Sequence, residues 1–89
     1  MAHADEAALK QLLPLLRQLR EIKGLKEMRP GTFHQKGSLL LQFHEEAGAL
    51  FGDLKRSRGG VDRYPVDTPV GQRKLLDDAK RRVDRGDDE

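Results

Sequence analysis

The chain has 89 residues, the size of one small domain with a small hydrophobic core. Its 17 Lys and Arg against 15 Asp and Glu give a net charge of +2, which is too balanced to indicate a nucleic-acid or membrane partner by itself. The absence of cysteine excludes disulfides, thiolate zinc sites and cysteine nucleophiles. The sequence shows neither a signal-peptide pattern nor the ~20 consecutive apolar residues of a membrane span, so we expect a cytoplasmic protein.

The first predicted element is an amphipathic helix that begins after Asp5, the expected N-cap. Its apolar stripe, spaced by three and four residues, consists of Leu9, Leu12, Leu16 and Leu19. Gly24 is the expected stop of this helix. Pro14 falls inside the pattern, where a proline removes a helical hydrogen bond. The sequence therefore predicts either a kink at Pro14 or a helix start near residue 13.

Extended runs joined by turns follow the first helix. The predicted turns are Lys36-Gly37, Ala47-Gly48 and Arg58-Gly59-Gly60. With a loop of two or four residues, the first turn is expected to pair His34 with Leu39 and Phe33 with Leu40. A turn of two or four residues centred on Ala47-Gly48 pairs Leu41 with Leu54, Glu45 with Leu50, His44 with Phe51, and Gln42 with Asp53.

Period-two alternation in the second strand separates an apolar from a mixed face. The apolar face holds Leu39, Leu41, Phe43 and Glu45, and the mixed face holds Leu40, Gln42, His44 and Glu46. The third hairpin should place Tyr64 beside Leu54 on the apolar face and let Arg56 face Asp62. Pro65 predicts an edge strand, because proline cannot donate to a ladder.

The C-terminal helix is expected to begin at Thr68-Pro69, an N-cap followed by proline. Its apolar face consists of Leu75, Leu76, Ala79 and Val83. The predicted fold class is α+β: an N-terminal helix, a four-stranded antiparallel meander and a C-terminal helix, with both helices packed on one sheet face. We expect a single domain over 1–89, with an ordered core at about 5–83 and a polar tail at 84–89.

His34, His44, Glu45 and Glu46 are the residues that could hold a metal ion or take part in acid–base chemistry. His34 and His44 would lie on the order of 15 Å apart along the strands, too far for a shared metal ion. Glu45 and Glu46 then belong to a solvated strand end. His44 and Asp53 could form an acid–base pair, but no nucleophile accompanies them, because Ser38 and Ser57 fall at distant turns. We expect no metal, no cofactor and no enzymatic activity.

A protein-binding role has the broadest support in the sequence. Leu13 and Leu15 lie off the main stripe of the first helix, and apolar residues also fall on the mixed sheet face. The predicted partner-binding residues are Leu40, Gln42, His44, Phe51 and Asp53. The expected partner is an unidentified protein or a second copy of the chain in a homodimer.

The alternative function is binding of nucleic acid or another polyanion through the Lys55–Gly60 hairpin and the C-terminal helix. The residues that would carry it are Lys55, Arg56, Arg58 and Arg63. Asp77, Asp78 and Asp84 interrupt the positive charge of the helix, which makes this the less favoured function.

The segments MRPGTFHQKGSLLLQFHEEAGALFGDLK and DRYPVDTPVGQRKLL resemble a family of small bacterial α+β proteins over about residues 24–80. The resemblance implies a fold and no particular activity. The helix–meander–helix order is also similar to the frataxin-like arrangement. The acidic first helix that would suit iron binding is absent, with only Asp5, Glu6 and Glu21 present, so that similarity concerns the fold alone.

Overall fold

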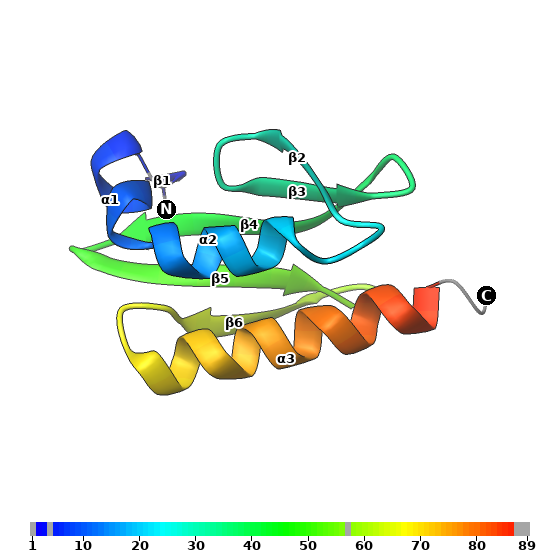
Figure 1. Cartoon of the computed structure of the whole chain (residues 1–89). Helices are drawn as coiled ribbons and strands as arrows, with labels where there is room; N and C mark the ends of the chain where they lie inside the picture. Colours follow the sequence, from blue (N-terminus) through cyan, green and yellow to red (C-terminus); the bar gives the residue numbers. More distant parts are fainter. Residues whose placement is uncertain (1, 4, 57, 87–89) are drawn as a thin grey trace.

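The computed structural model describes residues 2–3, 5–56 and 58–86 and shows an α+β fold (Figure 1). Its elements are β1 (Ala2–His3), α1 (Glu6–Gln11), α2 (Leu13–Arg20), β2 (Lys26–Arg29), β3 (Thr32–Gln35), β4 (Ser38–Glu46), β5 (Ala49–Lys55), β6 (Val61–Pro65) and α3 (Pro69–Gly86). None of the helices in the described ranges is long and apolar enough to cross a membrane.

The sheet has five consecutive antiparallel strands in the order β2-β3-β4-β5-β6, where four were predicted. The additional strand, β2, has the sequence KEMR, which lacks the apolar alternation that marks a strand. The two-residue β1 pairs with β4 beyond the end of β3, with Ala2 opposite Glu45. This pairing adds residues 2–3 to the sheet, ahead of residue 5, where the predicted core begins.

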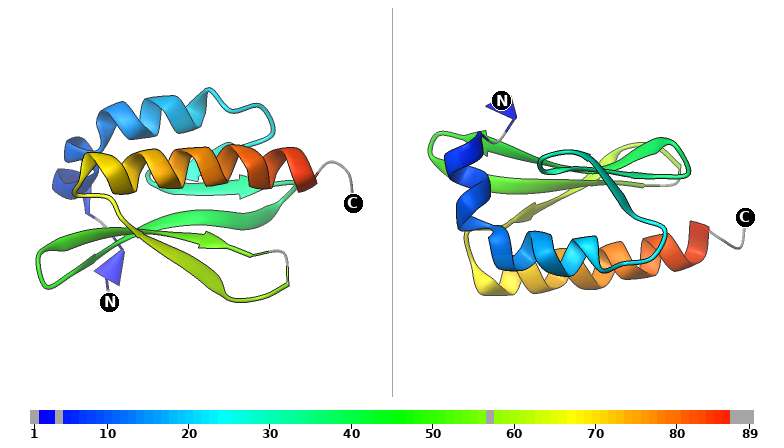
Figure 2. Two further views of the ribbon diagram at one scale, coloured as in Figure 1. Left: turned by 90° about the horizontal axis from the view of Figure 1, so that it is seen from below. Right: turned by 45° about the horizontal axis from the view of Figure 1, so that its top comes forward.

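In Figure 2, α2 and α3 lie side by side on the same side of the sheet, and α1 lies at one end of it. The hydrophobic core contains side chains from α1, α2, α3 and the sheet. Phe33, Phe43, Leu41 and Leu54 are fully buried sheet residues. Gly52 allows close packing, since a Cβ there would lie 2.8 Å from Leu75 Cδ2 of α3.

Pro14 starts a new helix rather than kinking a long one. The predicted first helix is divided at Leu12 into α1 and α2, and Pro14 occupies the first turn of α2. At that position the missing N–H has no intrahelical partner to lose. Asp5 caps α1 as predicted, accepting a 2.9 Å hydrogen bond from Ala8 N–H. The α2 helix ends at Arg20, earlier than predicted, and Gly24 follows with φ +90°.

Two of the predicted turns are confirmed, and the β4–β5 register is as predicted. In β3–β4 the His34–Leu39 pair is as predicted, whereas Phe33 pairs with Leu41 instead of Leu40. Lys36 and Ala47, each followed by glycine, have φ of 52°, so both hairpins use two-residue turns with positive φ. Opposite residues include His44 with Phe51 and Gln42 with Asp53, as alternation predicted.

The β5–β6 hairpin has a longer loop than predicted. Tyr64 pairs with Gly52 instead of Leu54, and Arg56 N–H donates to Gly60 C=O across the loop. The two-residue shift keeps Tyr64 on the helix-facing side because side chains alternate with period two. Val66 N–H donates to Leu50 C=O, so the even-numbered residues of β6 form the hydrogen bonds to β5 and the odd-numbered ones point their backbone groups away from it. Pro65 lies at an odd position on this edge strand, so its missing N–H costs no hydrogen bond of the sheet.

A register shift between β3 and β4 corrects the predicted position of Leu40. Phe33 pairs with Leu41, whereas His34 pairs with Leu39, so Leu40 is the extra residue of a bulge. Leu40 is 8% exposed and belongs to the hydrophobic core. It is therefore not on the mixed face with Gln42.

The α3 helix begins as predicted, with Thr68 Oγ1 accepting a 3.2 Å hydrogen bond from Gly71 N–H. It extends to Gly86, so the polar tail predicted from residue 84 is helical over 84–86. Residues 87–89 lie outside the described residues. Leu75, Leu76, Ala79 and Val83 are all buried, as their spacing predicted.

Candidate functional site

The sheet face opposite the helices holds four of the five predicted partner-binding residues. These are Gln42, His44, Phe51 and Asp53, which lie on β4 and β5 in direct cross-strand pairs. Leu40 is excluded from this surface by the bulge and by its burial in the core. Leu39 takes its place beside Gln42, where both line a shallow hollow with His34.

Asp53 is the centre of a polar network on this face and is only 7% exposed. Its carboxylate accepts hydrogen bonds of 2.9 and 3.1 Å from Arg63 and lies 3.2 Å from His44 Nε2. Arg63 also lies 3.3 Å from Glu46 and 5.5 Å from the Phe51 ring centroid. The charges of this face therefore partner one another across three strands.

The His44–Asp53 pair has the geometry of an oriented imidazole. Asp53 holds Nε2, and the buried Nδ1 has no hydrogen-bond partner among the described residues. Ser38 follows the Lys36-Gly37 turn at the other end of β4, and Ser57 lies outside the described residues. Within the described ranges, no three His, Asp or Glu side chains cluster as a metal site would require.

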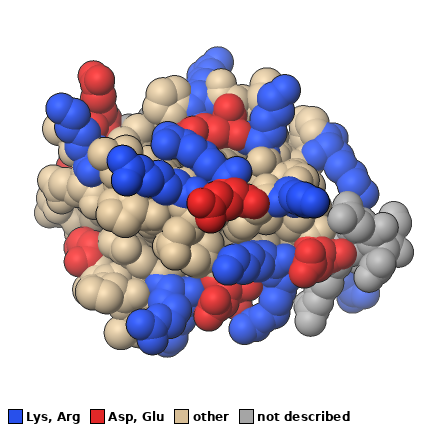
Figure 3. Space-filling model, in the orientation of Figure 1, with Lys and Arg blue, Asp and Glu red and all other residues tan. Residues whose placement is uncertain are grey.

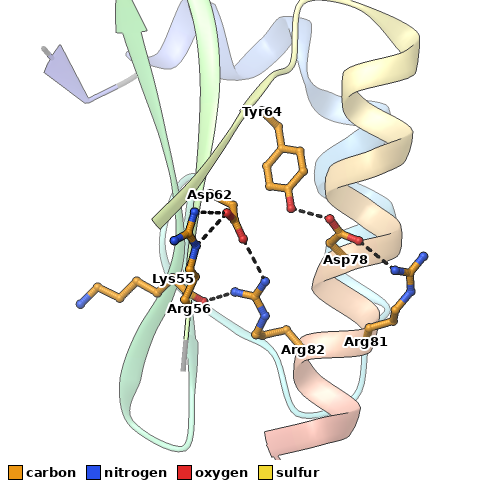
Figure 4. A network of polar contacts seen from close by, with 7 residues as sticks. All are labelled: Lys55, Arg56, Asp62, Tyr64, Asp78, Arg81 and Arg82. Carbon is orange, nitrogen blue, oxygen red and sulfur yellow. Dashed lines mark hydrogen bonds and ion pairs between the residues drawn. The ribbon is translucent and has the colours of Figure 1, made fainter. Parts of the chain in front are cut away.

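The basic hairpin is tied to α3 by ion pairs (Figure 4). Asp62 lies 2.7 Å from Arg56 and 3.3 Å from Arg82, which also donates to the Lys55 carbonyl. The hydrogen bond from Arg56 lowers the pKa of Asp62. Two of the four cations proposed for polyanion binding, Arg56 and Arg63, are thus paired with acids, while Lys55 and Arg58 are exposed.

Tyr64 adds a second tie between β6 and α3 (Figure 4). Its hydroxyl donates a 2.5 Å hydrogen bond to Asp78, which also lies 3.2 Å from Arg81. Burial and this acidic neighbour raise the pKa of Tyr64 far above its ordinary value. The phenol therefore stays protonated and serves as a structural donor.

A groove with a volume of about 630 Å³ opens between α1, α2 and the β2–β3 turn. Its lining residues are Glu6, Leu9 and Lys10 of α1, Leu13, Leu16 and Arg20 of α2, Arg29 of β2, and Pro30 of the turn. Leu13 is 37% exposed, whereas Leu15, the other leucine outside the predicted stripe, is 2% exposed. The groove thus combines apolar side chains with basic residues. Figure 3 shows Lys and Arg interspersed with Asp and Glu on the side of the molecule that carries α2 and α3.

Glu27 connects the two walls of this groove. Its carboxylate accepts a 2.6 Å hydrogen bond from Arg20 of α2 and a 3.0 Å bond from Gly31 N–H in the β2–β3 turn. Gly31 has φ +77°, and a Cβ there would lie 2.7 Å from Leu9 Cδ2. The positive φ therefore favours glycine in this turn, and a Cβ there would also require the end of the Leu9 side chain to move.

The stability that Glu27 supplies should depend on pH. Burial raises its pKa, but hydrogen bonds from Arg20 and Gly31 lower it more, so the pKa of Glu27 lies below its ordinary value. A carboxyl with a lowered folded pKa stabilises the fold above its unfolded pKa, and this contribution disappears as the pH falls through the folded pKa. Because Arg20 is 44% exposed, we expect Glu27→Gln to lower the free energy of unfolding by only about 1 kcal/mol at pH 7.

Urea denaturation at pH 7 and pH 3 measures this effect. The difference between wild type and Glu27→Gln should shrink at the lower pH, whereas the exposed Glu21→Gln should change stability little at either. A difference that is equal at both pH values would show that Glu27 acts through packing rather than charge.

Only part of the groove lining could be predicted from the sequence. Leu13 was noted because it departs from the apolar stripe, but Arg29 and Pro30 were not grouped with it because β2 was not predicted. No family model, curated protein or solved structure matches the chain.

Proposed function

We propose that this chain is a non-enzymatic protein-binding module that receives a segment of another protein in the α1–α2 groove. The observation that carries the proposal is the 37% exposure of Leu13 beside the buried Leu9 and Leu16 in a concave site. Water contact with an apolar side chain costs free energy that a covering segment would recover. A concave site that combines apolar side chains with a few charged groups is typical of a binding site.

The open sheet face is the weaker docking surface. Asp53 already accepts from Arg63 and contacts His44, and Arg63 also contacts Glu46. A protein covering these groups would remove them from water, and the cost of desolvating charges offsets much of what their attraction supplies. Phe51 contributes apolar area there, but its ring already contacts the Arg63 guanidinium.

Site-specific photo-crosslinking tests the proposal in cells that express the gene. Benzoylphenylalanine would replace Leu13 in one variant and Val70 in another, because Val70 is 64% exposed on α3 outside the groove lining. We expect a discrete crosslinked product with a different protein from position 13 and not from position 70. Excess wild-type protein should suppress this product. The Leu13→Asp variant should be a weaker competitor by a factor of about ten or more, the effect expected when a central leucine anchor is lost.

Two results would contradict the proposal. Equal crosslinking from positions 13 and 70, or equal competition by Leu13→Asp and wild type, would show that the groove is not the docking site. A product composed only of two copies of this chain would indicate a homodimer instead of a heterologous partner.

A further inference from the structure

We infer that the segment received by the groove is an acidic amphipathic helix of the partner protein. This inference rests on the proposed function and adds the chemistry of the partner. It follows from three properties of the groove: its shape, its charge and the absence of aromatic residues from its lining.

The shape favours a helix. The groove extends along α1 and α2 from Glu6 to Arg20, with the β2–β3 turn as its other wall. The eight residues of α2 span about 12 Å, a length that matches two turns of a partner helix. A helix of this kind presents anchors at positions i, i+3 or i+4, and i+7, and a central anchor would cover Leu13, the exposed leucine of the lining.

The charge favours carboxylates on the flanks of that helix. The lining holds three cations, Lys10, Arg20 and Arg29, against one anion, Glu6. Arg20 is neutralised by Glu27, while for Lys10 and Arg29 the described part of the chain provides no ion pair. Arg17 is exposed one turn after Leu13 and extends the basic surface along α2. Complementary charge of this type selects the partner and its orientation.

The lining argues against a single-stranded nucleic acid as the occupant. Proteins that bind such strands stack bases on aromatic side chains and follow the backbone with cations. The eight lining residues include leucines and proline but no Phe, Tyr or Trp. An apolar floor of this type gains more from burying leucine-like side chains than from contacting phosphates.

Selection from a displayed library of helical peptides tests the inference on the intact chain. The library would randomise both the anchor and the flanking positions, and the bait would be the wild-type protein. We expect enriched peptides to combine apolar residues at helical spacing with Asp or Glu on the flanks. Their affinity should fall about tenfold or more for Leu13→Asp and about three- to tenfold for the double variant Lys10→Glu/Arg29→Glu.

Charge reversal in the groove is the most direct test of the predicted preference for acidic partners. Selection against Lys10→Glu/Arg29→Glu should enrich Lys and Arg at the flanking positions while the apolar anchors stay the same. The control bait is Arg73→Glu/Lys74→Glu, which changes two exposed cations of α3 outside the groove lining. It should select the same acidic peptides as wild type.

The outcomes separate this inference from the proposed function. Enriched peptides that depend on Leu13 but show no charge preference would overturn the acidic partner and leave the groove as a docking site. Acidic peptides without apolar anchors and insensitive to Leu13→Asp would overturn both. In a parallel titration, we expect the wild-type groove not to bind single-stranded DNA. DNA binding by wild type that the Lys10→Glu/Arg29→Glu variant loses would favour a nucleic acid as the occupant.

Discussion

Replacement of Gly71 by alanine should lower the free energy of unfolding by about 3 kcal/mol, although glycine-to-alanine changes inside helices usually stabilise by about 1 kcal/mol. Gly71 lies in the first turn of α3, and a Cβ there would lie 1.6 Å from the carbonyl oxygen of Pro65. No side-chain rotation relieves a contact with backbone. The β6–α3 connection would therefore have to move, which also disturbs the Thr68 cap on Gly71 N–H.

Thermal and urea denaturation of Gly71→Ala measure the effect. For a domain of this size the loss corresponds to a fall of about 12–24 °C in Tm. Val70→Ala provides the control, because Val70 is 64% exposed in the same turn and should change stability by less than about 0.5 kcal/mol. A Gly71→Ala protein as stable as wild type would show that the close contact between α3 and Pro65 is absent in solution.

Truncation of Phe43 should be the more damaging of two equivalent phenylalanine replacements. Phe43 is fully buried on the helix-facing side of β4, against Gly52, and Phe43→Ala should cost about 3–5 kcal/mol through lost burial and a residual cavity. Phe51 lies on β5 with its side chain on the opposite face and is half-buried. Phe51→Ala should cost about 1–2 kcal/mol, including its contact with the Arg63 guanidinium.

Comparison of the two variants tests the assignment of the sheet faces. Both remove the same atoms from neighbouring strands, so the difference in their free energies of unfolding reports only the surroundings. Equal losses would mean that the face carrying Phe51 is covered as fully as the core. That result would indicate that the surface formed by Gln42, His44 and Asp53 is an interface covered by another molecule.

The position of Leu40 shows why the sequence could not predict every residue of the sheet face correctly. Alternation assigns every second residue to one face, and it placed Gln42, His44, Phe51 and Asp53 correctly. A bulge adds one residue to a strand and reverses the assignment before it, which moved Leu40 into the core. Neither Leu39 nor Leu40 carries a local sign of this, because all three consecutive residues at 39–41 are leucine.

The polyanion-binding residues show a different limit. Lys55, Arg56, Arg58 and Arg63 were grouped because they are close in sequence. In the structure Arg63 pairs with Asp53 across the sheet, and Arg56 pairs with Asp62 next to Arg82 of α3. Whether a cation is available to a ligand depends on acids brought to it by folding, and cation spacing along the chain does not contain that information.

The amino-acid sequence by itself determined the features that depend on local backbone preference. Glycines after Lys36 and Ala47 fixed the positions of two turns, the turn at Ala47-Gly48 fixed the β4–β5 register, and Thr68-Pro69 fixed the start of α3. The tertiary structure alone decided the pairing of β2, the burial of Leu40 and the groove at Leu13. The physical reason is that a turn or a cap involves neighbouring residues, whereas a groove requires α1, α2 and β2 to pack together before any of its walls exists.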